Sequence, residues 1–270
     1  MAKMAFYFFT AGTLTLGVAT LLYLWRLGTR GRSGERLATV FLWMGGLLLT
    51  GSMASRWIAS GHGPFSNTYE YSVSFAWAIA ASYAVVEQRY RVHKLGGLVL
   101  PIALALLIYA ATAPASIEPL IPALQNRPVL TAHVSVAIIA YGIFAVAFGA
   151  AVVWLVQGPN NRLGWLPPAE VMDDIAYRLV LVGFPFLSVM LILGAYWANI
   201  VWGRYWGWDP KESASLVTWL IYAAYLHTRT IARWRGRPSA ILLVIGFAAT
   251  LFTFIGVNLV LGTLHSFGGA

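Results

Sequence analysis

Long apolar stretches alternate with short polar segments along the whole chain. Eight of these stretches are long enough to span a membrane as a helix, at approximately 4–25, 37–58, 68–86, 95–113, 129–156, 176–198, 213–232 and 240–262. A bilayer crossing needs about 20 consecutive apolar residues, and hydrocarbon offers peptide groups no hydrogen-bond partner outside their own helix. The pattern therefore predicts an all-α, polytopic membrane helix bundle with about eight transmembrane helices, in a single domain over residues 1–270.

The composition supports a membrane protein and excludes several functions. Hydrophobic residues make up 59% of the chain and charged residues 10%, whereas charged residues make up about 25% of an ordinary soluble domain. The chain has no cysteine, so it can form no disulfide, thiolate metal site or thioether of its own. Its net charge is +9, but the basic residues lie in short connections between apolar stretches. We therefore expect a lipid bilayer, and no nucleic acid, as a partner.

The distribution of basic residues predicts the topology. Thirteen of the 18 Lys and Arg residues lie in the first, third, fifth and seventh connections. By the positive-inside rule these connections are cytoplasmic, so both termini and the even-numbered connections lie on the outer face. The first stretch has no cleavage site and is interpreted as a retained helix. His62 lies in the second connection, where a structural or gating role, a ligand and a proton donor all remain possible.

The sixth connection, residues 197–212, is the most aromatic part of the chain. Five aromatic residues fall within 12 positions: Trp197, Trp202, Tyr205, Trp206 and Trp208. Aromatic residues also gather at membrane interfaces without any ligand. Their concentration in one connection, with Gly203 and Gly207 between them, favours a platform for a planar ligand, because flat aromatic rings stack on large π-systems.

Charged residues follow these aromatic residues directly. In Asp209-Pro210-Lys211-Glu212, an acidic N-cap precedes a proline at the first helical position, which predicts the start of a helix. Lys211 and Arg204 are also outer-face cations in a chain that keeps most of its cations inside. We expect one or both to pair with carboxylates of a bound ligand, such as heme propionates, because charge-assisted hydrogen bonds are the strong ones.

Three further histidines are candidate iron ligands. His133 and His265 lie at outer helix ends, on the same side as the aromatic connection, and two imidazoles with a flat platform suit a six-coordinate heme iron. The alternative is that both are solvated interfacial residues. His227 lies in the stretch 213–232, about four helical turns from the aromatic connection. It is either a functional intramembrane residue or one that reaches the lipid headgroups beside Arg229. His93 is interpreted as a cytoplasmic anchor.

Two segments carry a family resemblance. The stretch from Trp202 to Glu212, WGRYWGWDPKE, and the segment 218–229 resemble the tryptophan-rich WWD signature of heme-handling proteins. They are most similar to the CcsA/ResC family of system II cytochrome c biogenesis. Further matches are Ser66-Asn67, Tyr69-Glu70, His133-Val134 and Leu264-His265, so the resemblance extends from the third apolar stretch to the C-terminus.

This resemblance implies a function and a set of site residues. It implies heme delivery and presentation on the outer face for covalent attachment to apocytochrome c, by a component of a holocytochrome c synthase (heme lyase). The ligand would be heme b, with His133 and His265 as external axial ligands, His227 in an inner site, and the heme-contacting residues Trp202, Trp206, Trp208, Asp209, Arg204 and Lys211. A CcsB/ResB-type membrane subunit would be the partner. The location would be the bacterial plasma (inner) membrane, with the WWD connection on the extracytoplasmic side.

Three other functions are weighed against this one. A CcmC-like protein loads heme onto a chaperone, but such proteins have fewer helices than eight. A membrane transporter of another class predicts intramembrane charges or broken helices, for which only His227, Pro101 and Pro185 offer support. A heme b electron-transfer subunit would place paired histidines within the membrane, not at its rim. No catalytic residue is assigned.

Overall fold

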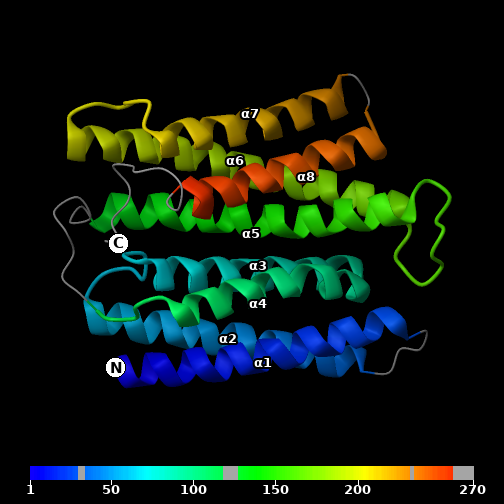
Figure 1. Ribbon diagram of the computed structural model, residues 1–270, viewed down its shortest axis with the longest axis horizontal. Helices are drawn as coiled ribbons and strands as arrows, with labels where there is room; N and C mark the ends of the chain where they lie inside the picture. Colours follow the sequence, from blue (N-terminus) through cyan, green and yellow to red (C-terminus); the bar gives the residue numbers. More distant parts are fainter. Residues whose placement is uncertain (30–33, 118–126, 232–233, 258–270) are drawn as a thin grey trace. The chain divides into compact units, whose positions relative to one another are not determined.

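The computed structural model describes residues 1–29, 34–117, 127–231 and 234–257, and within these ranges the protein is α-helical (Figure 1). Its helices are α1 (Ala2–Gly28), α2 (Glu35–Ser60), α3 (Thr68–Tyr90), α4 (Gly96–Thr112), α5 (Arg127–Gln157), α6 (Ala169–Trp202), α7 (Pro210–Thr230) and α8 (Arg237–Leu251). A 3₁₀ turn, η1 (His93–Leu95), precedes α4, and a π-helical turn, η3 (Phe252–Gly256), follows α8. The predicted all-α fold and all eight predicted helices are confirmed.

Six helical segments of the described chain are long and apolar enough to cross a membrane. They are Ala2–Gly28, Glu35–Ser60, His93–Thr112, Pro128–Gln157, Ala169–Trp202 and Arg237–Gly256. The helices α3 and α7 are not among them, because both are richer in Ser, Thr, Tyr and charged residues. The prediction of about eight membrane spans is therefore confirmed for six helices and stays a prediction for these two.

The helices divide into two compact units. The first comprises Met1–Pro119 with Leu163–Pro167, and the second comprises Leu120–Arg162 with Pro168–Ala270. In the first unit α1 packs along α2 and α4, and α3 packs on α4. In the second unit α5 packs on α6 and α8, and α7 packs on α6 and α8. That residues 1–270 form a single domain stays a prediction.

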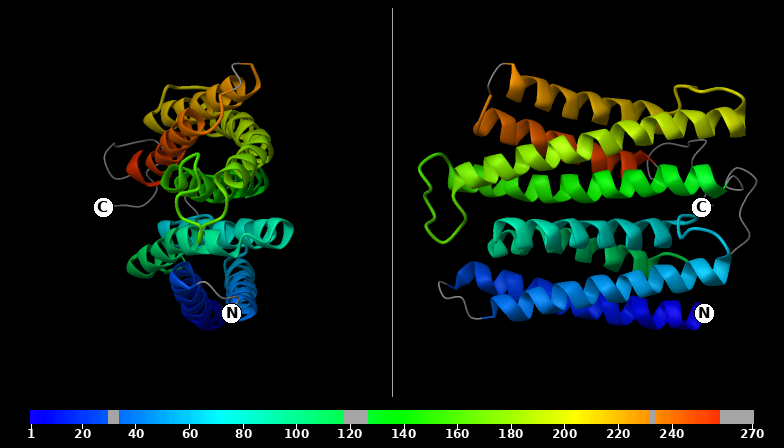
Figure 2. Two further views of the ribbon diagram at one scale, coloured as in Figure 1. Left: turned by 90° about the vertical axis from the view of Figure 1, so that its right-hand side faces the viewer. Right: turned by 180° about the vertical axis from the view of Figure 1, so that it is seen from behind.

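Within each unit, consecutive helices run in opposite directions (Figures 1 and 2). In the first unit the N-terminus, the α2–α3 connection and the end of α4 therefore share one end. In the second unit the start of α5, the α6–α7 connection and the end of α8 share one end. Each unit thus separates its even-numbered connections from its odd-numbered ones, as the predicted topology requires.

The sixth connection is shorter than predicted, because α6 continues to Trp202. No glycine or proline interrupts α6 between residue 198, the predicted end, and Gly203. Gly203 adopts a left-handed conformation (φ 72°) and caps the helix, a role that glycine fills because it has no Cβ. Trp197 and Trp202 therefore lie on α6, and only residues 203–209 are non-helical before α7.

Buried hydroxyl and carboxyl groups join the helices at the other end of the first unit. The Glu87 carboxylate accepts hydrogen bonds from the Tyr23 hydroxyl at 2.5 Å, the Tyr83 hydroxyl at 2.7 Å and the Thr39 hydroxyl at 2.5 Å. His93 Nδ1 lies 3.5 Å from the same carboxylate. His93 is therefore not simply an exposed anchor, since it belongs to a cluster that connects α1, α2, α3 and η1.

The predicted topology can be tested with single cysteines, because the natural chain has none and gives no labelling background. Thr68→Cys and Tyr205→Cys lie at exposed positions of the two proposed outer ends, and Gln88→Cys and Asn160→Cys at exposed positions of the opposite ends. In intact cells that carry the chain in their plasma membrane, a membrane-impermeant maleimide should label the first pair, and it should label the second pair only after permeabilisation. Labelling of all four sites in intact cells, or the reverse pattern, would contradict the topology.

Candidate functional site

Four of the nine predicted site residues lie in one short segment of the second unit, residues 203–209, here called the Trp-rich turn, and Trp202 and Lys211 lie close on either side of it. The turn ends where Asp209 caps α7, with its side chain accepting a hydrogen bond from Lys211 N at 2.9 Å. Glu212 completes a capping box by accepting from Asp209 N at 3.2 Å, and it also accepts from Gly207 N at 2.8 Å. The predicted N-cap is confirmed, and two carboxylates hold the turn against the start of α7.

Trp208 has an unusual backbone conformation within this turn. Its φ is +57° and its side chain is 71% exposed. A residue with a Cβ in the left-handed region costs about 1–2 kcal/mol relative to the right-handed one, and a bulky residue there is an outlier. The chain therefore holds a strained backbone at a position whose side chain faces outward.

The tryptophans of the Trp-rich turn, and those at the end of α6, form edge-to-face pairs. The ring centroids of Trp206 and Trp208 lie 5.8 Å apart at 87°, and those of Trp197 and Trp202 lie 4.9 Å apart at 77°. The Trp206 indole nitrogen Nε1 is buried, and no described residue accepts a hydrogen bond from it. A buried N–H group usually has an acceptor, so Trp206 offers a donor to a ligand of this segment.

Two cations accompany the aromatic rings. Arg204 is exposed, and its guanidinium lies over Gly207, where an added Cβ would come within 2.7 Å of Arg204 Nε. Burial lowers the pKa of the Lys211 ammonium to about 8, against the opposing effect of Asp209. Lys211 therefore keeps most of its charge at neutral pH, and a bound anion would raise its pKa again.

His133 lies on α5 and is seated against α6. Its Nδ1 lies 2.9 Å from the carbonyl oxygen of Met190. A carbonyl only accepts hydrogen bonds, so Nδ1 carries the hydrogen, and in the neutral ring Nε2 carries the lone pair. Gly194 makes room for the ring, because a Cβ there would lie 2.8 Å from His133 Cε1.

The two remaining histidines do not join these residues in the described structure. His227 is exposed on α7, about 24 Å along the helix from Lys211 at 1.5 Å per residue. Beside it, Arg229 pairs with Asp173 at 2.7 Å. His265 lies outside the described residues. In the described part of the chain, His133 lies in the second turn of α5, and the start of α5 shares an end of the second unit with the Trp-rich turn (Figure 1).

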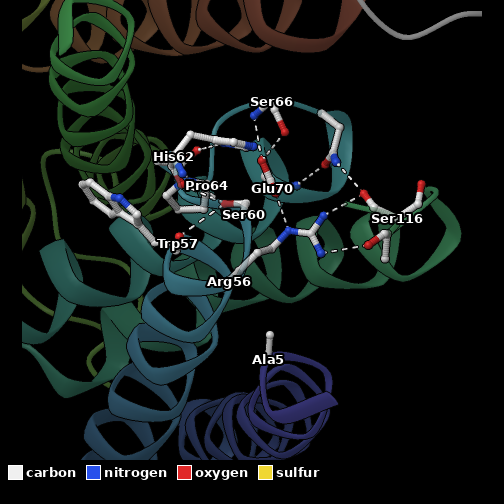
Figure 3. Close-up of polar contacts among 12 residues, drawn as sticks. Ala5, Arg56, Trp57, Ser60, His62, Pro64, Ser66, Glu70 and Ser116 are labelled. Carbon is white, nitrogen blue, oxygen red and sulfur yellow. Dashed lines mark hydrogen bonds and ion pairs between the residues drawn. The ribbon is translucent and has the colours of Figure 1, made fainter. Parts of the chain in front are cut away.

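Sequence reasoning missed a second polar cluster, at the α2–α3 connection of the first unit (Figure 3). The Arg56 guanidinium pairs with Glu70 and donates to the carbonyls of Ala115 and Ser116 at 2.8 and 3.0 Å. Glu70 also accepts from Ser66 N and Ser66 Oγ, both at 2.7 Å. Arg56, an outer-face cation within a mostly apolar stretch, was the sequence signal for this cluster.

His62 belongs to the same connection and is buried (Figure 3). Its Nδ1 lies 2.9 Å from the carbonyl oxygen of Gly63, and the Ser60 hydroxyl donates to the His62 carbonyl at 2.9 Å. These local contacts favour the structural role among those left open for His62. The second connection is thus held by hydrogen bonds within itself and by those of the neighbouring Arg56–Glu70 cluster.

Comparison with known proteins identifies the family of this chain. Residues 65–265 match the family model described as "Cytochrome C assembly protein". The chain belongs to the CcsA family of cytochrome c assembly proteins. The "Cytochrome c biogenesis protein CcsA" of Gloeothece citriformis is 33% identical over 87% of this chain and 88% of its own. The protein of that name from a Synechocystis species is 34% identical over 82% and 85%.

A solved structure has the same fold as this CcsA-family chain. "Cytochrome c Heme Lyase CcmF" aligns with a TM-score of 0.72 and 18% identity over 94% of this chain. This chain spans 46% of that structure's length, and the likeness supports the fold alone. With its family and six bilayer-length helices, the chain is an integral membrane protein of cytochrome c biogenesis.

Removing one partner of the buried Arg56–Glu70 pair should destabilise the first unit. Glu70→Ala leaves a guanidinium, whose side chain is 7% exposed, without its carboxylate, at an expected loss of about 3–5 kcal/mol. The double variant Arg56→Met/Glu70→Leu should lose less than Glu70→Ala, because no charge stays buried. The thermal midpoint of the detergent-purified protein measures both effects.

The exposed pair Arg178–Asp174 provides the control for this prediction. Its nitrogen and oxygen are 2.7 Å apart, but the side chains are 60% and 54% exposed. Asp174→Ala should therefore change the stability by less than about 1 kcal/mol. Equal midpoints for Glu70→Ala and Asp174→Ala would show that the buried pair is not a significant contributor.

A side chain at Gly194 should displace the His133 imidazole. Gly194→Ala is expected to cost about 1–3 kcal/mol through overpacking, whereas Gly46→Ala, at a helical glycine with nothing within 4 Å of its added Cβ, should cost nothing. The double variant His133→Ala/Gly194→Ala removes the clashing ring, so it should be more stable than the sum of its single variants predicts. If the thermal midpoint of the double variant falls by the sum of the two single-variant losses, Gly194 does not make the space that the His133 ring occupies.

Proposed function

We propose that this CcsA-family chain delivers heme to the extracytoplasmic side of its membrane and presents it for covalent attachment to apocytochrome c. In this role it is the heme-handling component of a holocytochrome c synthase. The observation that carries the proposal is the His133 imidazole, held by α6 at the same end of the second unit as the Trp-rich turn.

His133 has the features of an axial ligand. A metal-binding histidine usually donates its other ring N–H to a carbonyl or carboxylate, which orients the ring and fixes the tautomer. The hydrogen bond from His133 Nδ1 to the Met190 carbonyl has this form, and it directs Nε2 to the iron. His265 supplies the second axial nitrogen in the proposal, as the family resemblance implies.

The Trp-rich turn supplies the remaining contacts. The exposed ring of Trp208, with Trp206 edge-on beside it, offers a flat face to the macrocycle. The buried Trp206 N–H and the cations of Arg204 and Lys211 suit the carboxylates of a propionate-bearing ligand. Trp202 and Asp209 hold the two ends of this surface, at the last residue of α6 and the N-cap of α7.

The attachment step requires no nucleophile from this chain. Each cysteine thiol of the apocytochrome adds across a heme vinyl group, so that sulfur bonds to one vinyl carbon and the hydrogen ends on the other. No oxidant or reductant is consumed in that addition. The contribution of the chain is to hold the vinyl groups and the incoming thiols in reach of one another, and to release the product when a histidine of the apocytochrome replaces a protein ligand.

A partner chain completes the proposed pathway. His227 is exposed on α7, where it can contribute one ligand of an inner heme site while another chain supplies the second. We assign that role to a CcsB/ResB-type membrane subunit. The relatives compared above are cyanobacterial, which favours a thylakoid membrane over the bacterial plasma membrane that the sequence alone suggested.

Absorption spectra of purified variants test the proposal. Wild-type chain, expressed with its candidate partner and adequate heme, should carry heme with a bis-histidine spectrum in both oxidation states. His133→Ala and His265→Ala should each abolish or alter that spectrum, because each removes one axial nitrogen. His227→Ala should remove only the part of the absorption that belongs to the inner site.

His93→Ala is the matched control, because it removes an imidazole that lies against Glu87 at the other end of the first unit. Its heme spectrum should equal that of the wild type. The proposal fails if the wild type carries no heme under these conditions, or if the three ligand variants have unaltered spectra.

A further inference from the structure

The N–H groups on either side of Trp208 converge on one oxygen atom. Gly207 N and Asp209 N donate to the same oxygen of Glu212, Oε2, at 2.8 and 3.2 Å. Successive N–H groups point to one anion where the backbone passes through a left-handed residue, as in anion-binding nests. The φ of +57° at Trp208 and the position of the Glu212 carboxylate are therefore two parts of one arrangement.

Helix capping alone does not account for both hydrogen bonds. A capping box requires only that the glutamate at the third helical position accept from the N-cap N–H, which is the Asp209 bond. The bond from Gly207 N lies beyond the helix, on the far side of Trp208. Glu212 thus reaches past the start of α7 and fixes the backbone of the Trp-rich turn on both sides of the exposed ring.

The outcome of this geometry is an oriented but uncovered aromatic ring. Asp209, the next residue, is buried, while Trp208 is 71% exposed and meets Trp206 edge-to-face. Burial therefore cannot be what orients Trp208. Strained backbone conformations of this kind gather at ligand sites, where the surrounding hydrogen bonds determine how a side chain is presented.

We infer that Glu212 is a positioning residue that holds Trp208 in its exposed conformation so that the indole meets the porphyrin face of heme. This inference rests on the proposed function, because it names the ligand that Trp208 faces. Glu212 itself does not touch the ligand and acts through the backbone on either side of Trp208.

The conformation can be tested on protein without heme. In chain labelled with 5-fluorotryptophan, the ¹⁹F resonance of residue 208 is the one that Trp208→Phe removes. Glu212→Ala should shift or broaden that resonance, because both N–H groups lose their acceptor. Glu212→Gln should leave it close to its wild-type position, because the amide oxygen still accepts. An unchanged resonance in Glu212→Ala would overturn the positioning role, whatever the protein binds.

The consequence for the ligand can be tested by titrating the same variants with hemin and recording the absorbance. Trp208→Ala should weaken hemin binding by about threefold to tenfold, the loss expected for one aromatic stacking contact. Glu212→Ala should weaken it to a similar extent, Glu212→Gln by less, and Trp208→Ala/Glu212→Ala by no more than Trp208→Ala alone. That non-additivity is the expected signature of a residue that acts through its neighbour.

Three outcomes distinguish the possible failures. Additive losses in the double variant would mean that Glu212 does not act through Trp208. A wild-type affinity in Trp208→Ala would mean that this ring does not meet heme, even if the resonance of residue 208 depends on Glu212. No hemin binding by the wild type would instead count against the proposed function itself. Glu170→Ala, at an exposed glutamate in the first turn of α6, is the control and should leave both readouts unchanged.

Discussion

A peptide group in hydrocarbon must find its hydrogen-bond partner within its own helix, and the organisation of this chain follows from that constraint. In the described chain, the charged side chains that pair across helices consequently lie near helix ends. The Arg56–Glu70 pair lies at one end of the first unit, and the hydroxyl groups around Glu87 lie at the other. In the second unit, Asp209 and Glu212 lie at the start of α7. The chemistry available to the protein is therefore concentrated where helices begin and end.

The same constraint explains how far the fold could be predicted from the sequence. Apolar stretches of membrane-spanning length leave the backbone no alternative to a helix, and all eight helices were found. Helix ends were harder to predict, because hydropathy reports where the chain is apolar and not where helical hydrogen bonding stops. The helix α6 runs to Trp202 because no glycine or proline follows residue 198 until Gly203, whose left-handed conformation ends the helix. The helices α3 and α7, with 23 and 21 residues, are long enough to cross a bilayer. They are too polar to be counted among the apolar membrane-spanning helices.

The candidate site divides in a similar way into local and non-local features. The capping of α7 by Asp209 follows from neighbouring residues, so the sequence was sufficient to predict it. The seat of His133 was not predictable, because Met190 and Gly194 are more than 50 residues away in the chain. The left-handed conformation of Trp208 was also not predictable, since that region is ordinarily reserved for glycine and small polar residues. The roles of His265 and His227 stay predictions.

The two described parts of the candidate site, at His133 and at Trp208, hold their side chains in a defined orientation by different interactions. A ligand-binding side chain that is ordered before binding loses less conformational entropy when the ligand arrives. The His133 ring fits against α6 because Gly194 has no side chain, and its Nδ1 donates a hydrogen bond to the Met190 carbonyl, which fixes its orientation. Trp208 is ordered by a neighbour that is charged, because the Glu212 carboxylate at a helix N-terminus, where the helix dipole favours it, fixes the backbone on both sides. Both devices depend on α6 and α7 as rigid supports, which is why a ring that is mostly exposed can still have a defined orientation.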